Sequence, residues 1–275
     1  NWGTYQNDVG YTHDWRTGDF NGDGNLDIIE INAGPNHNQF IVQLAKQNEI
    51  GYEPGILFGN TSNTVDVKHF KIADINGDGK SDLVLFSPGY GIYVWLTNSN
   101  VTGFEISSGT FFSFFYINWG TELPEQYKFG DFNGDGKTDV VHFNTTNYKF
   151  EILLSTGTGF TNAGYWATGT AYNYHDRYKI GDLNGDGKSD IYYMSNDGKI
   201  FVYISTGSGF INPLTSYIGN NGEEMGANYN RYKVGDINGD SHSEVLSYED
   251  NKIYVWKADA RSEERRVGKE CRSRW

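Results

Sequence analysis

Five copies of one acidic loop recur along the chain and constrain its fold more than any other feature. The first four read Asp-x-Asn-Gly-Asp-Gly-x-x-Asp and occupy residues 19–27, 74–82, 131–139 and 182–190, and a weaker fifth copy occupies residues 236–244. Successive copies begin 51–57 residues apart, a period typical of proteins built from stacked structural units. The spacing therefore predicts a repeat protein.

The polar positions of the loop match the coordination chemistry of calcium. Calcium takes six to eight oxygen ligands, and carboxylates at alternate positions of a tight loop can converge on one ion. With each loop numbered 1–9, we expect side-chain oxygens from positions 1, 3, 5 and 9 and a backbone carbonyl from position 7, whose side chain should face solvent. Glycine at positions 4 and 6 allows the positive φ that such a loop needs. Without an ion the carboxylates should repel one another and the loop should open.

The candidate calcium ligands are the residues at the odd positions of each loop. They are Asp19, Asn21, Asp23, Asn25 and Asp27; Asp74, Asn76, Asp78, Lys80 and Asp82; Asp131, Asn133, Asp135, Lys137 and Asp139; Asp182, Asn184, Asp186, Lys188 and Asp190; and Asp236, Asn238, Asp240, His242 and Glu244. We expect about four bound Ca²⁺ ions. The fifth loop has Ser241 where the others have glycine and Glu244 at position 9, so its occupancy stays open.

The residues after each loop argue against an EF-hand. An EF-hand places a bidentate glutamate at position 12 and a helix after the loop. Position 12 is Glu30 in the first copy but Leu85, His142 and Tyr193 in the next three, which excludes an EF-hand for most of the loops. The segments that follow, such as residues 140–143, are rich in β-branched and aromatic residues, which favours strands. The loops are therefore expected to join strands. The alternative is that they are acidic hairpin turns without a metal.

One repeat, read outward from its loop, contains several short strands. In the fourth copy, segments 177–181, 191–195 and 200–204 read as strands, and an irregular aromatic stretch after residue 205 adds a fourth. Radially repeated units of four antiparallel strands are the blades of a β-propeller. The prediction is an all-β fold, a β-propeller of four-stranded blades over residues 1–260, with five repeats and a calcium loop between strands of each blade.

Two motifs resemble those of a known family. Gly-Asp-x-Asn-Gly-Asp-Gly-Lys-[Ser/Thr]-Asp occurs at 130–139 and 181–190, and Ser-Thr-Gly-x-Gly-Phe occurs at 155–160 and 205–210. On these motifs residues 1–257 resemble the FG-GAP and VCBS calcium-binding propeller repeats, which are similar to those of integrin α-subunit heads, some fungal lectins, and bacterial surface proteins and toxins. The integrin-type Phe-Gly…Gly-Ala-Pro element is missing. The resemblance implies the fold and the metal, whereas a fold alone does not assign a function.

Composition excludes some classes of partner. The net charge of −13, without a basic stripe, disfavours nucleic-acid binding, and no run of eighteen apolar residues predicts a membrane span. The single cysteine, Cys271, leaves the repeats without disulfides. Weak calcium sites suit the millimolar calcium outside cells, so a secreted or cell-surface location is expected.

The two ends of the chain depart from the repeat pattern. Residues 261–275 reverse the local charge and fit no repeat, so a non-native or disordered tail is expected there. Two closures stay open: a strand around Trp2 completes the last of five blades, or the chain is part of a larger propeller.

Binding is a better prediction than catalysis. No nucleophile elbow, zinc-type histidine pair or phosphate-binding loop occurs, so we expect no enzyme. Trp119, Trp166 and Tyr217 lie in or near irregular segments where rings could stack on a sugar, or could instead cap blade edges. The expected partner is a glycan, as for a lectin, or an extracellular protein. Alternatives are an adhesion or toxin-scaffold propeller and an accessory domain of a polysaccharide-degrading enzyme.

Overall fold

The structure, a computed structural model, is all-β. It describes residues 12–33, 38–61, 67–87, 91–105, 110–112, 126–144, 147–169, 177–194, 199–217, 232–249 and 252–257. Among these residues, Val67–His69 form a short 3-10 turn, η1. The same ranges contain no helix with the length and apolar character that crossing a membrane requires.

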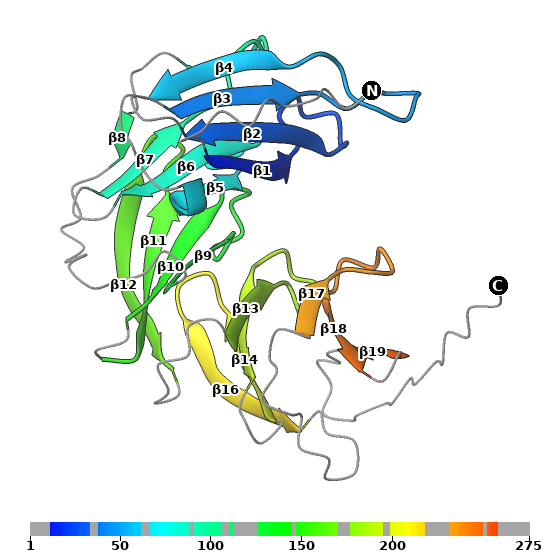
Figure 1. The fold of residues 1–275 in the computed structure, drawn as a ribbon. Helices are drawn as coiled ribbons and strands as arrows, with labels where there is room; N and C mark the ends of the chain where they lie inside the picture. The colour runs from blue at the N-terminus through cyan, green and yellow to red at the C-terminus, as the bar shows by residue number, and fades with distance from the viewer. Residues whose placement is uncertain are drawn as a thin grey trace. The chain divides into compact units, whose positions relative to one another are not determined.

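The chain divides into two compact units. The first comprises residues 1–124 and 155–160 and contains two four-stranded antiparallel sheets with strand orders β1-β2-β3-β4 and β5-β6-β7-β8 (Figure 1). Their strands are β1 (Thr12–Gly18), β2 (Asp27–Ala33), β3 (Asn38–Gln43), β4 (Ile56–Thr61), β5 (Phe70–Ala73), β6 (Asp82–Ser87), β7 (Gly91–Trp95) and β8 (Thr110–Phe112).

The second unit comprises residues 125–154 and 161–275. Its sheets have the strand orders β12-β11-β10-β9, β13-β14-β15-β16 and β17-β18-β19. The strands are β9 (Tyr127–Gly130), β10 (Asp139–Phe143), β11 (Lys149–Ser155), β12 (Phe160–Thr168), β13 (Tyr178–Gly181), β14 (Asp190–Met194), β15 (Lys199–Ser205), β16 (Phe210–Tyr217), β17 (Tyr232–Gly235), β18 (Glu244–Glu249) and β19 (Lys252–Lys257).

Each repeat forms one sheet, and its acidic loop joins the first two strands. In the fourth repeat, β13 ends at Gly181, next to position 1, and β14 begins at Asp190, which is position 9. These two residues face each other in the antiparallel register. The prediction that the loops join strands is confirmed, and so are four strands for the first four repeats. The described part of the fifth repeat has three strands, and closure into a propeller stays a prediction.

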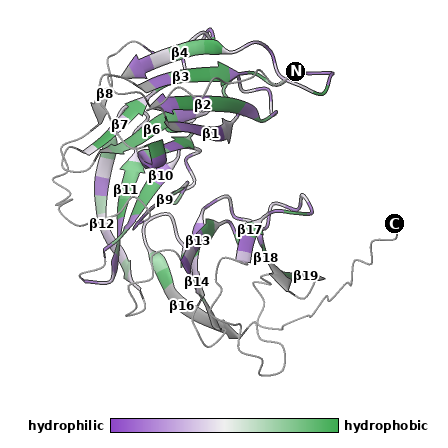
Figure 2. Cartoon of the chain, in the orientation of Figure 1, coloured by the Kyte–Doolittle hydropathy of each residue, from purple (hydrophilic) through white to green (hydrophobic). Residues whose placement is uncertain are grey.

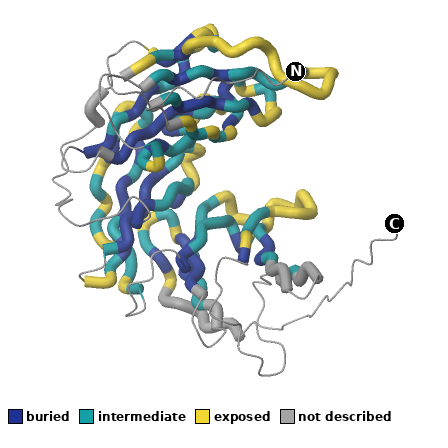
Figure 3. The backbone as a smooth tube through the Cα atoms, in the orientation of Figure 1, coloured by how far each residue is buried: buried dark blue, intermediate teal, exposed yellow. Residues whose placement is uncertain are grey.

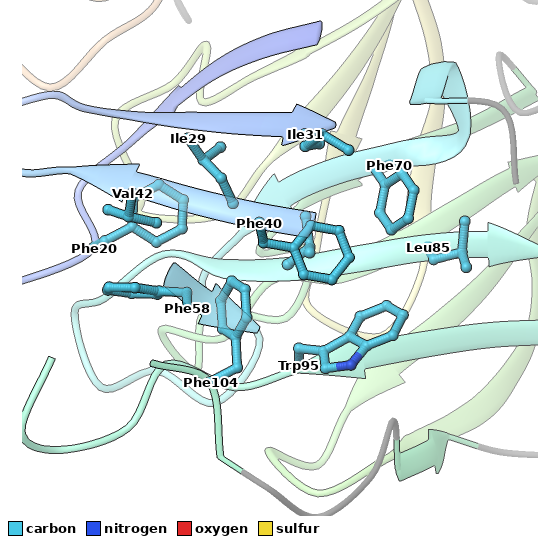
Figure 4. Packing of buried hydrophobic residues seen from close by; sticks show 11 residues of the cluster. Phe20, Ile29, Ile31, Phe40, Val42, Phe58, Phe70, Leu85, Trp95 and Phe104 are labelled. Carbon is cyan, nitrogen blue, oxygen red and sulfur yellow. The ribbon is translucent and has the colours of Figure 1, made fainter. Parts of the chain in front are cut away.

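Aromatic rings fill the core of the first unit. Phe40 of β3 lies at its centre, with ring centroids 5.4 Å from Phe70, 5.7 Å from Trp95 and 6.0 Å from Phe104 (Figure 4). The rings meet edge-on or tilted, the arrangements that aromatic pairs prefer. Because Phe40 comes from one sheet and Phe70 and Trp95 from the next, this core joins the two sheets of the unit.

The second unit has an equivalent core between its first two sheets. Phe150 of β11 lies 4.9 Å from Tyr203 and 5.2 Å from Tyr178 between ring centroids, and Tyr178 stacks on Phe143 at 4.4 Å. In the third strands β7, β11 and β15, Val94, Trp95, Ile152, Leu153 and Tyr203 are buried.

Buried residues lie mainly in the strands, and exposed residues lie mainly in the connections between them. Apolar residues concentrate in strands such as β3, β6 and β11 (Figure 2), and the connection between β3 and β4 is exposed over residues 47–55 (Figure 3). All five residues of β10 are buried, which requires cover on both faces of its sheet. Trp2, Trp119 and the tail 261–275 lie outside the described residues, so the closure alternatives and the tail stay predictions.

Candidate metal sites

The first aspartate of each loop organises the loop backbone. In the second loop, Asp74 Oδ1 accepts hydrogen bonds from the N–H of Gly77 (2.7 Å) and Asp78 (3.2 Å), and Oδ2 accepts one from Gly79 (2.9 Å). Gly77 and Gly79 have φ of 75° and 82°, which glycine adopts without steric cost. The other four loops share the bonds from positions 4 and 6.

Positions 3 and 5 continue this chain of local bonds. Asn76 Oδ1 accepts the N–H of Asp78 at 3.0 Å, and Asp78 Oδ1 accepts the N–H of Lys80 at 2.9 Å. Each oxygen has a second lone pair. The loop therefore holds these side chains in fixed turns while leaving one acceptor site on Asn76 Oδ1 and one on Asp78 Oδ1.

Position 9 differs from the others because it is fully buried. Asp82 has no exposed surface, and its two oxygens accept the N–H of Ile75 and of Thr97, both at 2.9 Å. Burial raises the pKa of Asp82 to about 7, and these two hydrogen bonds only partly oppose that shift. Asp190 is buried in the same way and its pKa is raised to about 7 for the same reason. A nearby cation would favour the ionised form of both groups.

The lysines at position 7 are placed differently from the prediction. They were expected to face solvent, but Lys80 Nζ lies 2.8 Å from Asp78 Oδ2, and Lys137 and Lys188 make the same contact with Asp135 and Asp186 at 2.8 and 2.9 Å. Although partial burial opposes the shift, the bonds from Lys80 lower the pKa of Asp78. The hydrogen bond to Asp135 raises the pKa of Lys137. The reason is electrostatic: the ammonium neutralises a carboxylate in a loop of like charges.

The fifth loop keeps the backbone but not the polar arrangement. Ser241 adopts a φ of 68° where the other loops have glycine. The longer Glu244 side chain reaches inward, so that its Oε2 accepts the N–H of Ile237 at 3.0 Å and its Oε1 accepts the amide of Asn238 at 2.6 Å. His242 Nδ1 lies 3.4 Å from Asp240 Oδ1. The side chain of Asn238, at position 3, is thus turned toward Glu244, at position 9, by a direct hydrogen bond.

The donor set fits a hard cation. Among the described residues, no group of three His, Cys, Asp or Glu side chains is arranged as a metal site by itself. The loops instead offer a mixed set of carboxylate, amide and backbone oxygens, which suits calcium. In three loops an ammonium already lies against the position-5 carboxylate. In these loops the lysine ammonium is the cation in contact with Oδ2 of the position-5 aspartate, an oxygen that would also bind a metal ion.

Neighbouring loops within a unit are bonded to each other. The backbone N–H of the serine at position 8 donates to the carbonyl of the preceding loop's position 1: Ser81 to Asp19 (2.6 Å), Ser189 to Asp131 (2.6 Å) and Ser243 to Asp182 (2.5 Å). These bonds place loops 1 and 2 side by side in the first unit. They place loops 3, 4 and 5 in a row in the second unit.

The Ser-Thr-Gly-x-Gly-Phe motif makes a further contact with the preceding loop. Ser205 Oγ donates to the carbonyl of Phe132 at 2.6 Å and accepts the N–H of Gly207 at 3.1 Å. Thr206 N–H bonds to the carbonyl of Gly209 at 2.9 Å and closes the turn. In the first unit, Ser155 makes the same bond to Ile75 at 2.6 Å. The motif therefore forms a turn and also a bond between repeats, which its sequence did not indicate.

The aromatic candidates for ligand binding are only partly described. Trp166 in β12 is half-buried and packs edge-on against Phe210 with centroids 5.4 Å apart. Trp119 lies outside the described residues, and for Tyr217 the structure describes the strand but not the side chain. Sequence reasoning missed Tyr165, which is 51% exposed. Lys149 Nζ lies over the Tyr165 ring, 4.9 Å from its centroid, and the Tyr165 hydroxyl lies 3.5 Å from the Asn147 amide.

The alternation of side chains along β12 explains which ring faces solvent. Successive side chains of a strand point to opposite faces. Residues 161, 163 and 165 are exposed, whereas Trp166 lies on the other face and packs toward the core. Gly164 has a φ of 81° and donates its N–H to Asn162 Oδ1 at 2.6 Å. The sequence alone did not show which face is covered, because Tyr165 and Trp166 are adjacent aromatic residues.

The FG-GAP-like repeat family matches residues 74–142, 131–193 and 182–247, which together make up more than half of the chain. The chain belongs to this family. Each match begins at the first aspartate of a loop and runs past the next one, so the second and third matches contain the bonds that join loops 3, 4 and 5. The first loop, residues 19–27, lies outside the matched segments. No curated protein matches the chain.

Several solved structures are similar over most of the chain. A structure of the Photorhabdus luminescens Tc holotoxin pore aligns with a TM-score of 0.60 and 15% identity over 90% of this chain and 12% of that chain. The exotype rhamnogalacturonan lyase YesX aligns with a TM-score of 0.36 and 12% identity over 90% of this chain and 56% of that chain. The V. cholerae biofilm matrix protein Bap1 aligns with a TM-score of 0.33 and 15% identity over 90% of this chain and 38% of that chain. The toxin likeness supports the fold alone, and the other two carry no argument.

Proposed function

We propose that the chain is a calcium-stabilised β-propeller that serves as an extracellular, non-enzymatic binding module for glycans. The observation that carries the calcium part is the position-5 carboxylate of three loops, which has one oxygen bonded to the loop backbone and the other to an ammonium. The second oxygen is thus already a cation site. The surrounding acceptors are oxygens, the ligands that calcium takes.

Calcium is expected to raise thermal stability, because it binds the folded loops and not the unfolded chain. At ten times its dissociation constant, each ion contributes about 1.4 kcal/mol. Calorimetry should count about four ions, and about three after Asp78→Ala or Asp135→Ala. Asp240→Ala should change the count less, because Glu244 already bonds to Asn238 in its loop. Equal melting temperatures in calcium and in chelator would remove the metal from the proposal.

The propeller arrangement is supported by how successive sheets meet within each unit. The same N–H to carbonyl bond joins loop 1 to loop 2, loop 3 to loop 4 and loop 4 to loop 5. A repeated contact of one kind generates a regular succession of sheets, and radial succession of four-stranded sheets is a propeller. We propose this arrangement for the whole chain, with a five-bladed ring and a larger propeller as the two forms it can take.

The glycan part rests on the polar and aromatic surface around Tyr165. Sugar-binding surfaces combine an exposed ring with nearby hydrogen-bonding groups, because a tyrosine offers an apolar face and a polar tip. Tyr165 is 51% exposed, Tyr148 is 37% exposed, and the Asn147 amide lies at the Tyr165 hydroxyl. Tyr148 has a φ of 59°, a conformation that is uncommon for a bulky residue and often marks functional sites.

Replacing Tyr165 by alanine is expected to weaken glycan binding about tenfold, by removal of the stacking face, and to leave the calcium count unchanged. Trp166→Ala is a poorer reporter, because its ring packs against Phe210 and its loss also disturbs the core. Tyr52→Ala is the matched control, since Tyr52 is 37% exposed on the connection between β3 and β4 in the first unit. A glycan array gives the readout, and equal binding by the Tyr165 and Tyr52 variants would contradict this site.

A scaffold or adhesion role is the second candidate. The chain aligns with 12% of the length of the Tc holotoxin chain, which suits a propeller embedded in a larger protein assembly. An accessory domain of a polysaccharide-degrading enzyme is the third candidate. Capture of a protein partner without any calcium-dependent signal on a glycan array would favour the scaffold role over the glycan role.

A further inference from the structure

The ammonium at position 7 and a calcium ion need the same oxygen. The backbone N–H of Lys188 bonds to Asp186 Oδ1 at 2.9 Å, while its Nζ lies 2.9 Å from Asp186 Oδ2. Lys80 and Lys137 place both groups in the same way. One residue thus holds both oxygens of the carboxylate, one through its backbone N–H and the other through its ammonium. Because like charges repel, an ion that bound at Oδ2 would push the ammonium away.

The stem of the lysine is positioned by glycines of neighbouring segments. A Cβ built on Gly134, at position 4 of the preceding loop, would lie 3.0 Å from Lys188 Cγ, and one built on Gly207 would lie 3.5 Å from Lys188 Cδ. In the first unit, a Cβ on Gly22 would lie 3.5 Å from Lys80 Cγ. Glycine at these places leaves room for the stem. The side chains of Lys80, Lys137 and Lys188 are accordingly only 17%, 27% and 21% exposed.

The first and fifth loops lack the ammonium. Position 7 of the first loop is Asn25. Asp23 Oδ2 accepts the Asn21 amide at 3.0 Å, as Asp186 Oδ2 accepts the Asn184 amide at 3.1 Å beside its lysine. The backbone N–H of Asn25 still bonds to the other oxygen at 2.8 Å. The two kinds of loop therefore have the same backbone and differ in one charge. In the fifth loop, position 7 is His242, whose ring contacts the Asp240 carboxylate.

We propose that the position-7 lysine is a built-in counter-ion that competes with calcium, so that loops 2, 3 and 4 bind calcium more weakly than loop 1. With calcium absent, the ammonium neutralises the position-5 carboxylate and keeps the loop closed. With calcium bound, the ammonium is released to solvent. The chain then fills its loops in two stages as calcium rises. This inference rests on the proposed calcium function and assigns an affinity-setting role to Lys80, Lys137 and Lys188.

The test replaces the charge and keeps the stem. Lys188→Gln is expected to tighten calcium binding at one site about two- to fivefold, the range for a partly exposed ion pair, and to lower the melting temperature in chelator. Asn25→Lys should weaken the tightest site by a similar factor. Lys233→Gln, at an exposed position of β17 outside the loops, controls for net charge and should do neither. Titration calorimetry gives the affinities and the number of sites.

The outcomes distinguish a failure of the calcium function from a failure of the lysine competition. If the unaltered chain takes up no calcium, the calcium function falls and the competition falls with it. If the unaltered chain binds calcium but Lys188→Gln leaves the affinity unchanged, or changes it no more than Lys233→Gln, only the competition is overturned. In an Asp186→Ala background, which removes the ion from this loop, Lys188→Gln should no longer lower the melting temperature in chelator, because the shared oxygen is gone. A persisting effect there would place the lysine's action elsewhere.

Discussion

Asp190→Ala is expected to lower the free energy of unfolding by about 4 kcal/mol, even with calcium removed by a chelator. The carboxylate is fully buried and accepts the N–H of Leu183 at 3.0 Å and of Ser205 at 2.8 Å, both of them buried bonds. Alanine leaves two buried N–H groups unsatisfied, at about 1–3 kcal/mol each. Urea denaturation in chelator measures the loss.

Asp186→Ala is the matched control in the same loop. Asp186 is exposed, and its ion pair with Lys188 is of the kind worth at most about 1 kcal/mol. In chelator its loss should therefore be small, whereas in calcium it should grow by the contribution of the missing ion. Equal losses for the two variants in chelator would show that position 9 has no structural role apart from the metal.

The large effect at position 9 follows from where its two bonds go. One oxygen of Asp190 bonds to Leu183 at the start of the loop, and the other bonds to Ser205 at the end of β15. Asp27 connects Phe20 and Ala45 in the same way, at 2.8 and 2.7 Å. A single carboxylate thus ties the loop to the second and third strands of its sheet. The motif combines a structural aspartate at position 9 with polar residues that face the proposed ion.

The loops and strands were predictable because their interactions are local. Every backbone bond to Asp74 and Asn76 comes from a residue at most five positions away, so the spacing of aspartate, asparagine and glycine determines the turn. The strands after the loops follow from runs of β-branched and aromatic residues. A short motif that repeats along the chain therefore defines both the loop and the sheet around it.

Contacts between repeats were not predictable, because they depend on residues far apart in the chain. The Ser205 hydroxyl bonds to the carbonyl of Phe132, 73 residues earlier, and nothing local distinguishes that serine from an ordinary turn residue. The lysines at position 7 were expected in solvent for the same reason, since the glycines beside their stems belong partly to another repeat. At Tyr165 and Trp166, the packing of Trp166 against Phe210, 44 residues later, decides which of the two adjacent rings is covered.

Gly130→Ala is expected to destabilise the second unit by about 2–3 kcal/mol, the usual cost of overpacking a tight contact. A Cβ at this position would lie 2.7 Å from Ser189 Cβ and 2.8 Å from Ile180 Cγ2. The backbone cannot move apart easily there, because Ser189 N–H donates to the carbonyl of the adjacent Asp131 at 2.6 Å. Glycine at this position is therefore required by the approach of the next repeat.

Gly136→Ala separates this steric effect from backbone strain. Gly136 has a φ of 81°, and a Cβ there would meet nothing within 4 Å, so alanine costs only the left-handed conformation, about 1–2 kcal/mol. Ser189→Gly in the Gly130→Ala background should recover part of the loss, because it removes the nearest atoms, and the same substitution alone should not stabilise. Thermal or urea unfolding measures all three variants. If Gly130→Ala proved no more harmful than Gly136→Ala, the close contact between neighbouring loops would not be what holds the repeats together.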